Sequence, residues 1–157
     1  MRFATLATAL TSATLASSRL IGIAAPSTLA PNSTFTLTLL SEGYIQSVAD
    51  VAVAWGFSLA PGYPGTLGSY TQSAYLGPEK SNQGQENVTI TATVPAGLAM
   101  DAYQGKDILL NAGIYSLYGA SGGATVTGFN VTVRVGESTG GEVVESEGQG
   151  WIQNTVA

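Results

Sequence analysis

Residues 44–57 read YIQSVADVAVAWGF, and this stretch decides the predicted fold. From Val51 onward every second residue is large, and the residues between them are Ala or Gly. A period of two with β-branched residues favours a strand over a helix. Small apolar residues, where a half-exposed strand would have polar ones, predict a strand covered on both faces. We therefore predict a central strand with Val51, Val53, Trp55 and Phe57 on one side and Trp55 anchoring the core.

Composition indicates one domain of strands and turns. The chain has 157 residues, with 20 Gly, 6 Pro and only 10% charged residues, which fits a single globular domain. Its net charge of −5 argues against nucleic acid or an anionic membrane as a partner. The sequence has no cysteine and no histidine. We therefore predict a core without disulfides, and no metal or cofactor.

The N-terminus has the pattern of a secretory signal. Arg2 precedes a modestly apolar run at 3–15, and small residues at 14–16 or 16–18 offer cleavage sites. The run is too short to span a bilayer. We predict a signal peptide at 1–18 and secretion of the remaining chain. Three N-x-S/T sequons agree with that route, and they predict glycosylation at Asn32, Asn87 and Asn130.

Alternating segments separated by Gly and Pro continue along the chain. The predicted strands outside the central one are 20–25, 34–40, 73–76, 87–94, 107–118 and 125–135. Pro26 is expected to end the first strand, and 95–105 to hold one helical turn. This spacing predicts an all-β fold, an antiparallel two-sheet immunoglobulin-like sandwich of about seven strands over 19–136. Residues 137–157 are rich in Gly, Ser and Glu, which predicts a disordered acidic tail.

The sequence contains no complete catalytic motif. Residues 119–123 match the G-x-S-x-G pattern, but a serine hydrolase needs a histidine and a strand-to-helix elbow. A glycine-rich turn between strands explains the match. The acidic residues are scattered, and we interpret them as solvated: Glu42, Asp50, Glu79, Glu86, Asp101 and Asp107. We predict that the protein is not an enzyme.

Loop tyrosines form the one suggestive cluster, Tyr63, Tyr70 and Tyr75, with Lys80 close by in the sequence. Aromatic rings with a polar tip are common in binding surfaces for proteins and sugars. The same rings could instead cover the open end of a sandwich. Both interpretations remain open at this point.

Five segments together resemble a known family. They are EGYIQSV at 42–48, YPGTLG at 63–68, YLGPEKSN at 75–82, SLYGA at 116–120 and GFNVTV at 128–133. In order and spacing they are similar to the fungal necrosis-inducing secreted effectors of the Nis1 type, from about residue 19 to 135.

The resemblance implies a secreted effector that induces plant necrosis and suppresses pattern-triggered immunity. The implied partners are the shared co-receptor of the receptor-like kinases and a receptor-associated cytoplasmic kinase. Because kinase domains are cytosolic, translocation into host plant cells would be required. We expect a monomer. The alternative is a wall-associated carbohydrate-binding or structural module, because immunoglobulin-like sandwiches host many functions.

Overall fold

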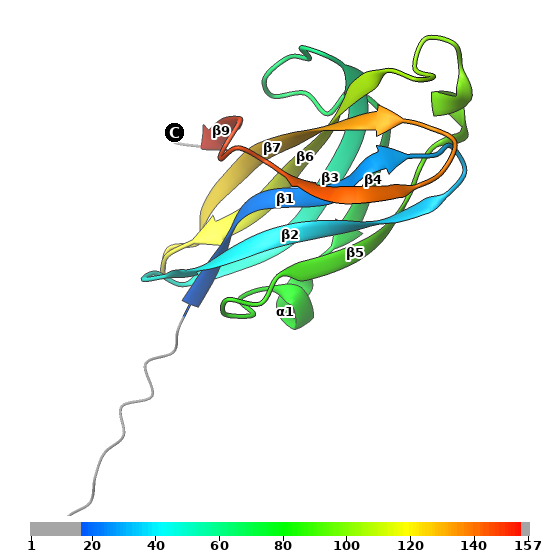
Figure 1. Cartoon of the computed structure of the whole chain (residues 1–157). Helices are drawn as coiled ribbons and strands as arrows, with labels where there is room; N and C mark the ends of the chain where they lie inside the picture. The colour runs from blue at the N-terminus through cyan, green and yellow to red at the C-terminus, as the bar shows by residue number, and fades with distance from the viewer. Residues whose placement is uncertain (1–16, 155–157) are drawn as a thin grey trace, which may run out of the picture.

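The computed structural model describes residues 17–154. Apart from Ser17 and Ser18, the predicted signal peptide lies outside these residues. Short helical turns interrupt a series of strands (Figure 1). The elements are β1 (Ser17–Leu29), β2 (Thr34–Tyr44), β3 (Val48–Leu59), β4 (Ser69–Tyr75), α1 (Gly77–Lys80), β5 (Val88–Thr93), the 3-10 turn η1 (Ala96–Ala99), β6 (Asp107–Tyr118), β7 (Gly123–Val135), β8 (Gly140–Glu145) and β9 (Trp151–Asn154).

The strands form one mixed sheet that curls into a nearly barrel-shaped body (Figure 1). Their order is β4-β3-β6-β7-β1-β2-β5, with β8 on β1 and β9 on β7. All neighbours are antiparallel except β1 and β7, which pair in parallel through Thr28 and Leu29. On the opposite side the Gln72 side chain joins β4 to the end of β5. Its Nε2 donates to the Thr93 carbonyl at 2.8 Å.

The all-β prediction is confirmed, but the two-sheet immunoglobulin-like sandwich is not. The strands around β1 and those around β6 lie in front of and behind the core in Figure 1. The parallel contact between β1 and β7 nevertheless links them into a single hydrogen-bonded sheet. This contact depends on β1 continuing through Pro26, which was expected to end the strand. A register shift between Pro26 and Thr28 accommodates the proline, as bulges allow.

The core lies where the alternating patterns predict it. Trp55 is 3% exposed, and the other inward residues of β3, Val53 and Phe57, are fully buried. Strands β2, β5 and β7 bury the apolar side of their predicted alternation. Because β3 lies between β4 and β6, its prediction as an interior strand is confirmed. The core contains no disulfide, since the sequence has no cysteine.

A bulge in β3 changes the predicted face of two residues. The register with β6 shifts between Asp50 and Ala52, so that Val51 has no direct partner. Val51 is half-buried, and Asp50 points into the sheet instead. A strict period of two from Trp55 would place Val51 inward and Asp50 outward. An extra residue in one strand reverses that assignment for everything before it.

The outer face of β3 is partly covered, as its small residues predicted. Leu67, from the β3–β4 connection, and Trp151 of β9 both lie over the sheet near Gly113 of β6. A Cβ added at Gly128 of β7 would overlap the Trp151 indole. Glycine on β7 therefore lets the indole lie directly on the backbone.

The prediction of a disordered tail at 137–157 is wrong for the described residues. Strand β8 pairs with β1, and β9 pairs with β7. The Thr139 Oγ1 accepts a hydrogen bond of 2.8 Å from Ala30 N, and the Ser146 Oγ accepts one of 3.0 Å from Ile23 N. Val144 packs against the core. The segment is acidic, but it is part of the fold.

Candidate protein-interaction surface

One end of the sheet presents an exposed aromatic surface. It combines the β3–β4 connection, the start of β4 and the connection from η1 to β6. The Tyr70 and Tyr103 rings meet edge to face, 6.4 Å between centroids, and the Tyr70 hydroxyl lies 3.8 Å from the Met100 sulfur. Tyr63 is 82% exposed and lines a hollow of about 420 Å³ together with Leu59 and Tyr103. We call Leu59, Tyr63, Tyr70, Met100 and Tyr103 the aromatic end.

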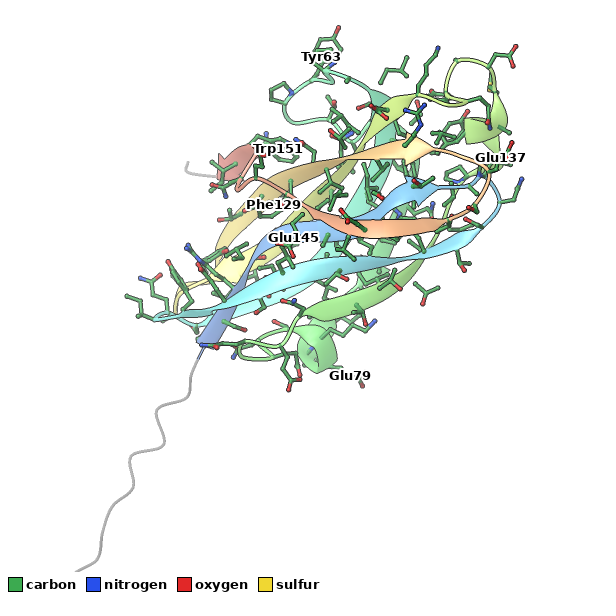
Figure 2. All side chains as sticks on the ribbon, in the orientation of Figure 1. Tyr63, Glu79, Phe129, Glu137, Glu145 and Trp151 are labelled. Atoms are coloured by element: carbon green, nitrogen blue, oxygen red, sulfur yellow. The ribbon has the colours of Figure 1, made fainter. Side chains whose placement is uncertain are left out.

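The composition of the aromatic end suits protein contact. Leu59 is 47% and Met100 57% exposed, so apolar surface surrounds the tyrosine rings. Tyrosine and methionine are enriched in protein interfaces, where charged residues are depleted. Tyr63 lies at the tip of its loop (Figure 2). An exposed ring beside a hollow is the geometry of an anchor residue.

The structure separates the predicted tyrosine cluster into two places. Tyr63 and Tyr70 both belong to the aromatic end, where each lies next to Tyr103. Tyr75 ends β4 at the other side of the molecule, next to α1, and Lys80 ends that helix. Strand β4 separates Tyr70 from Tyr75 by up to about 17 Å, at about 3.4 Å per residue. Tyr75 is 72% exposed, with its ring over Gly77. The expectation of one cluster is therefore wrong.

The three sequon asparagines lie on the surface. Asn32 occupies the turn between β1 and β2 with φ 62. Asn87 precedes β5, and Asn130 lies on β7 with its side chain on the outer face. All three are exposed, as are Thr34, Thr89 and Thr132. Each sequon could therefore accept a glycan without disturbing the core, and occupancy stays a prediction.

Asp50 is a buried acid that the sequence pattern missed. It is 3% exposed, and its Oδ1 accepts a hydrogen bond of 2.6 Å from Ser116 Oγ. Its backbone N–H donates to Ser81 Oγ at 2.7 Å. Burial raises the pKa of the Asp50 carboxyl, and the Ser116 hydrogen bond opposes that shift. The interpretation of Asp50 as a solvated surface acid is wrong, because the bulge at Val51 turns it inward.

Near Asp50, a charged pair and two aromatic rings lie at the end of the sheet opposite the aromatic end. The Arg19 Nη2 lies 2.6 Å from Glu42 Oε1, and its guanidinium lies 4.6 Å from the centre of the Tyr44 ring. Tyr44 meets Tyr118 edge to face at 6.0 Å. Burial raises the pKa of Tyr118, with a smaller effect from Asp50. Ion pairs this exposed contribute about 0–1 kcal/mol to stability.

Among the described residues, no three His, Cys, Asp or Glu side chains come together as metal ligands do. None of the described helices has the length and apolar character needed to cross a membrane. The G-x-S-x-G match lies in the turn between β6 and β7, where Gly119 and Gly122 have φ 69 and 65. The glycine-rich turn predicted there is confirmed.

Comparison with known proteins finds related sequences over most of the chain. The sequence profile of the Nis1 family matches residues 16–134. A protein named necrosis-inducing secreted protein 1 from Colletotrichum orbiculare is 44% identical over 149 residues, which cover 94% of this chain and 88% of the relative. The protein of the same name from Colletotrichum higginsianum is 46% identical over 134 residues, covering 85% and 89%.

Proposed function

This chain belongs to the Nis1 family, and on that premise we propose a secreted effector that suppresses plant pattern-triggered immunity by binding host kinases. The names of its relatives support secretion and necrosis induction. The proposed targets are the cytoplasmic kinase regions of the shared receptor-like co-receptor and its associated cytoplasmic kinase. The protein acts by occupying a surface of the kinase.

The aromatic end is the observation that carries a binding function. Leu59, Tyr63 and Tyr103 line a hollow of about 420 Å³. Tyr70 adjoins this hollow through its contact with the Tyr103 ring, and Met100 through its contact with Tyr70. Interface energy concentrates in a few such anchors, which lose water when a partner covers them. We propose that the kinase contacts this end. The alternative, a wall-associated carbohydrate-binding or structural module, was argued from the many functions of immunoglobulin-like sandwiches, and the single mixed sheet gives that argument no support.

Titration of the purified protein against the recombinant kinase region of the co-receptor tests the proposal. We expect the Tyr63→Ala, Met100→Ala double variant to weaken binding at least about tenfold, since each removes an exposed anchor. Tyr75→Ala is the matched control, because it removes a similarly exposed ring at the other end. The melting temperatures of the double variant and of the control should both stay close to that of the parent. No association at micromolar concentration, or equal loss in the control, contradicts the proposed surface.

Expression in leaf tissue tests where the protein acts. Kinase regions are cytosolic, whereas the sequons would be modified in the secretory lumen. We expect a form lacking residues 2–16 to suppress the immune response when made directly in the host cytosol. Suppression by the secreted form would then require uptake by the host cell. Suppression by the secreted form alone would place the target outside the cell and contradict a cytosolic kinase.

A further inference from the structure

The sequon at Asn130 differs from the other two in its surroundings, because an aromatic ring lies beside it. We propose that Asn130 carries an N-linked glycan whose first sugars pack on the Trp151 ring, and that this glycan fastens β9 to the sheet. The inference rests on the secretory route of the proposed function. It does not depend on kinase binding.

The sequon is placed on β7 by strand alternation. Phe129 and Val131 are buried, whereas Asn130 and Thr132 are exposed on the outer face. Gly128 lies on that same face, two residues before Asn130. A glycan on Asn130 would therefore leave the molecule on the side where β9 and Trp151 lie.

Strand β9 brings an aromatic ring beside this asparagine. Trp151 pairs with Gly128, and the Gly150 N–H donates to the Gly128 carbonyl at 2.9 Å. The Trp151 indole lies flat over Gly128, where any Cβ would overlap it. A Cβ at Gly150 would lie 3.2 Å from Asn130 Nδ2, the atom to which a glycan is joined. The attachment atom thus borders β9 itself.

A small hollow between two aromatic residues receives the asparagine. Its volume is about 80 Å³, and its lining includes Pro61, Tyr63, Asn130 and Trp151. Figure 2 shows Trp151 on β9 and Tyr63 on the loop beyond it. The neighbouring Asn111 lies on the same face, and its Nδ2 donates to Ser58 Oγ at 2.9 Å. A first sugar on Asn130 would enter the space between the indole and the loop.

A saccharide suits this setting for a physical reason. One face of a pyranose ring carries several C–H groups, and the face of an indole is electron-rich, so the two attract while both lose water. The glycan would remain hydrated on its other side, as surface glycans are. Contact between sugar and indole would hold Trp151 on Gly128 and so resist release of β9.

The other sequons supply matched controls. Asn32 lies in a turn with φ 62. Asn87 borders a hollow whose lining includes Glu79, Lys80 and Glu86, and no aromatic residue lines that hollow. A glycan at Asn87 therefore lacks the ring that would couple it to a strand.

The test uses the full chain secreted from a eukaryotic host that adds N-glycans. Peptide mass spectrometry gives occupancy at each sequon, and thermal unfolding is measured before and after enzymatic glycan removal. We expect Asn130 to be occupied. Losing its glycan through Thr132→Ala should lower the melting temperature by roughly 2–4 °C, whereas Thr89→Ala should leave it unchanged. The same variants from a bacterial host, which adds no glycan, give the effect of each substitution alone.

Trp151→Leu tests the coupling. In this background we expect glycan removal at Asn130 to leave the melting temperature unchanged. If this variant does not fold, Tyr63→Ala should show a reduced glycan effect, because Tyr63 lines the same hollow. An unmodified Asn130 in the secreted protein overturns the proposal. A glycan effect that persists without the ring, or equals that at Asn87, also overturns it. A chain that is not secreted contradicts the proposed function instead.

Discussion

Asp50 places a carboxylate inside the sheet, and its ionisation should set part of the pH dependence of stability. Burial raises its pKa above the value of about 3.9 for an unfolded chain. The folded state therefore binds this proton more tightly than the unfolded state. The resulting stabilisation is fully present below the unfolded pKa and is lost as pH rises through the folded pKa. We expect the unfolding free energy of the parent, relative to Asp50→Asn, to fall as the pH rises above about 4. Urea unfolding at several pH values measures this difference, and parallel profiles would contradict it.

Ser116 supplies the hydrogen bond that makes the charge of Asp50 tolerable. Its Oγ lies 2.6 Å from Asp50 Oδ1. Ser116→Ala would leave a buried carboxylate without this donor, and we expect a loss of about 1–3 kcal/mol in the free energy of unfolding. Ser121→Ala is the control, because Ser121 is exposed in the β6–β7 turn; its effect should stay within about 0.5 kcal/mol. Equal effects of the two substitutions would mean that the hydrogen bond contributes nothing.

At the scale of elements, strands β8 and β9 should stabilise the fold. Together they cover β1 and the first part of β7, and they bring Val144 and Trp151 against the sheet. Deleting residues 137–157 would uncover the parts of β1 and β7 that pair with β8 and β9, together with this apolar surface. We expect the free energy of unfolding to fall by roughly 2 kcal/mol or more, because the apolar surface that Val144 and Trp151 cover would return to water. Chemical denaturation of the shortened chain measures the loss. Unchanged stability would support the disordered tail that the sequence predicted.

Sequence periodicity found the strands that bury one whole side. Alternation predicted β2, β5 and β7 correctly, because each turns a continuous apolar row toward the core. Strand β8 carries no such row, and its attachment depends on contacts more than 100 residues away, such as Ser146 with Ile23. The bulge at Val51 could not be predicted from the sequence either, because it is defined by the pairing register with β6. For the candidate site, the sequence identified Tyr63 and Tyr70 but could not show that the length of β4 separates them from Tyr75.

At the scale of the whole molecule, the proposed kinase contact and the proposed glycan site are neighbours. The aromatic end closes one end of the sheet, and the hollow beside Asn130 lies on the outer face of β7. Tyr63 borders both. A glycan packed on Trp151 would therefore lie at the margin of the proposed kinase contact. Protein made in the host cytosol would lack this glycan and leave Tyr63 fully accessible.

The start of β1 bears on where the predicted signal peptide would be cleaved. Ser17 and Ser18 already pair with Tyr44 and Gly43 of β2, and Ser18 N donates to Asn82 Oδ1 at 2.7 Å. Cleavage after Ser18 would remove these contacts, whereas cleavage after Ala16 keeps them. We expect the secreted protein to begin at Ser17, measured by mass spectrometry of its N-terminal peptide. A start at Arg19 would contradict this. In that case Ser17 and Ser18 would contribute nothing to stability, and chains starting at Ser17 and at Arg19 would have the same melting temperature.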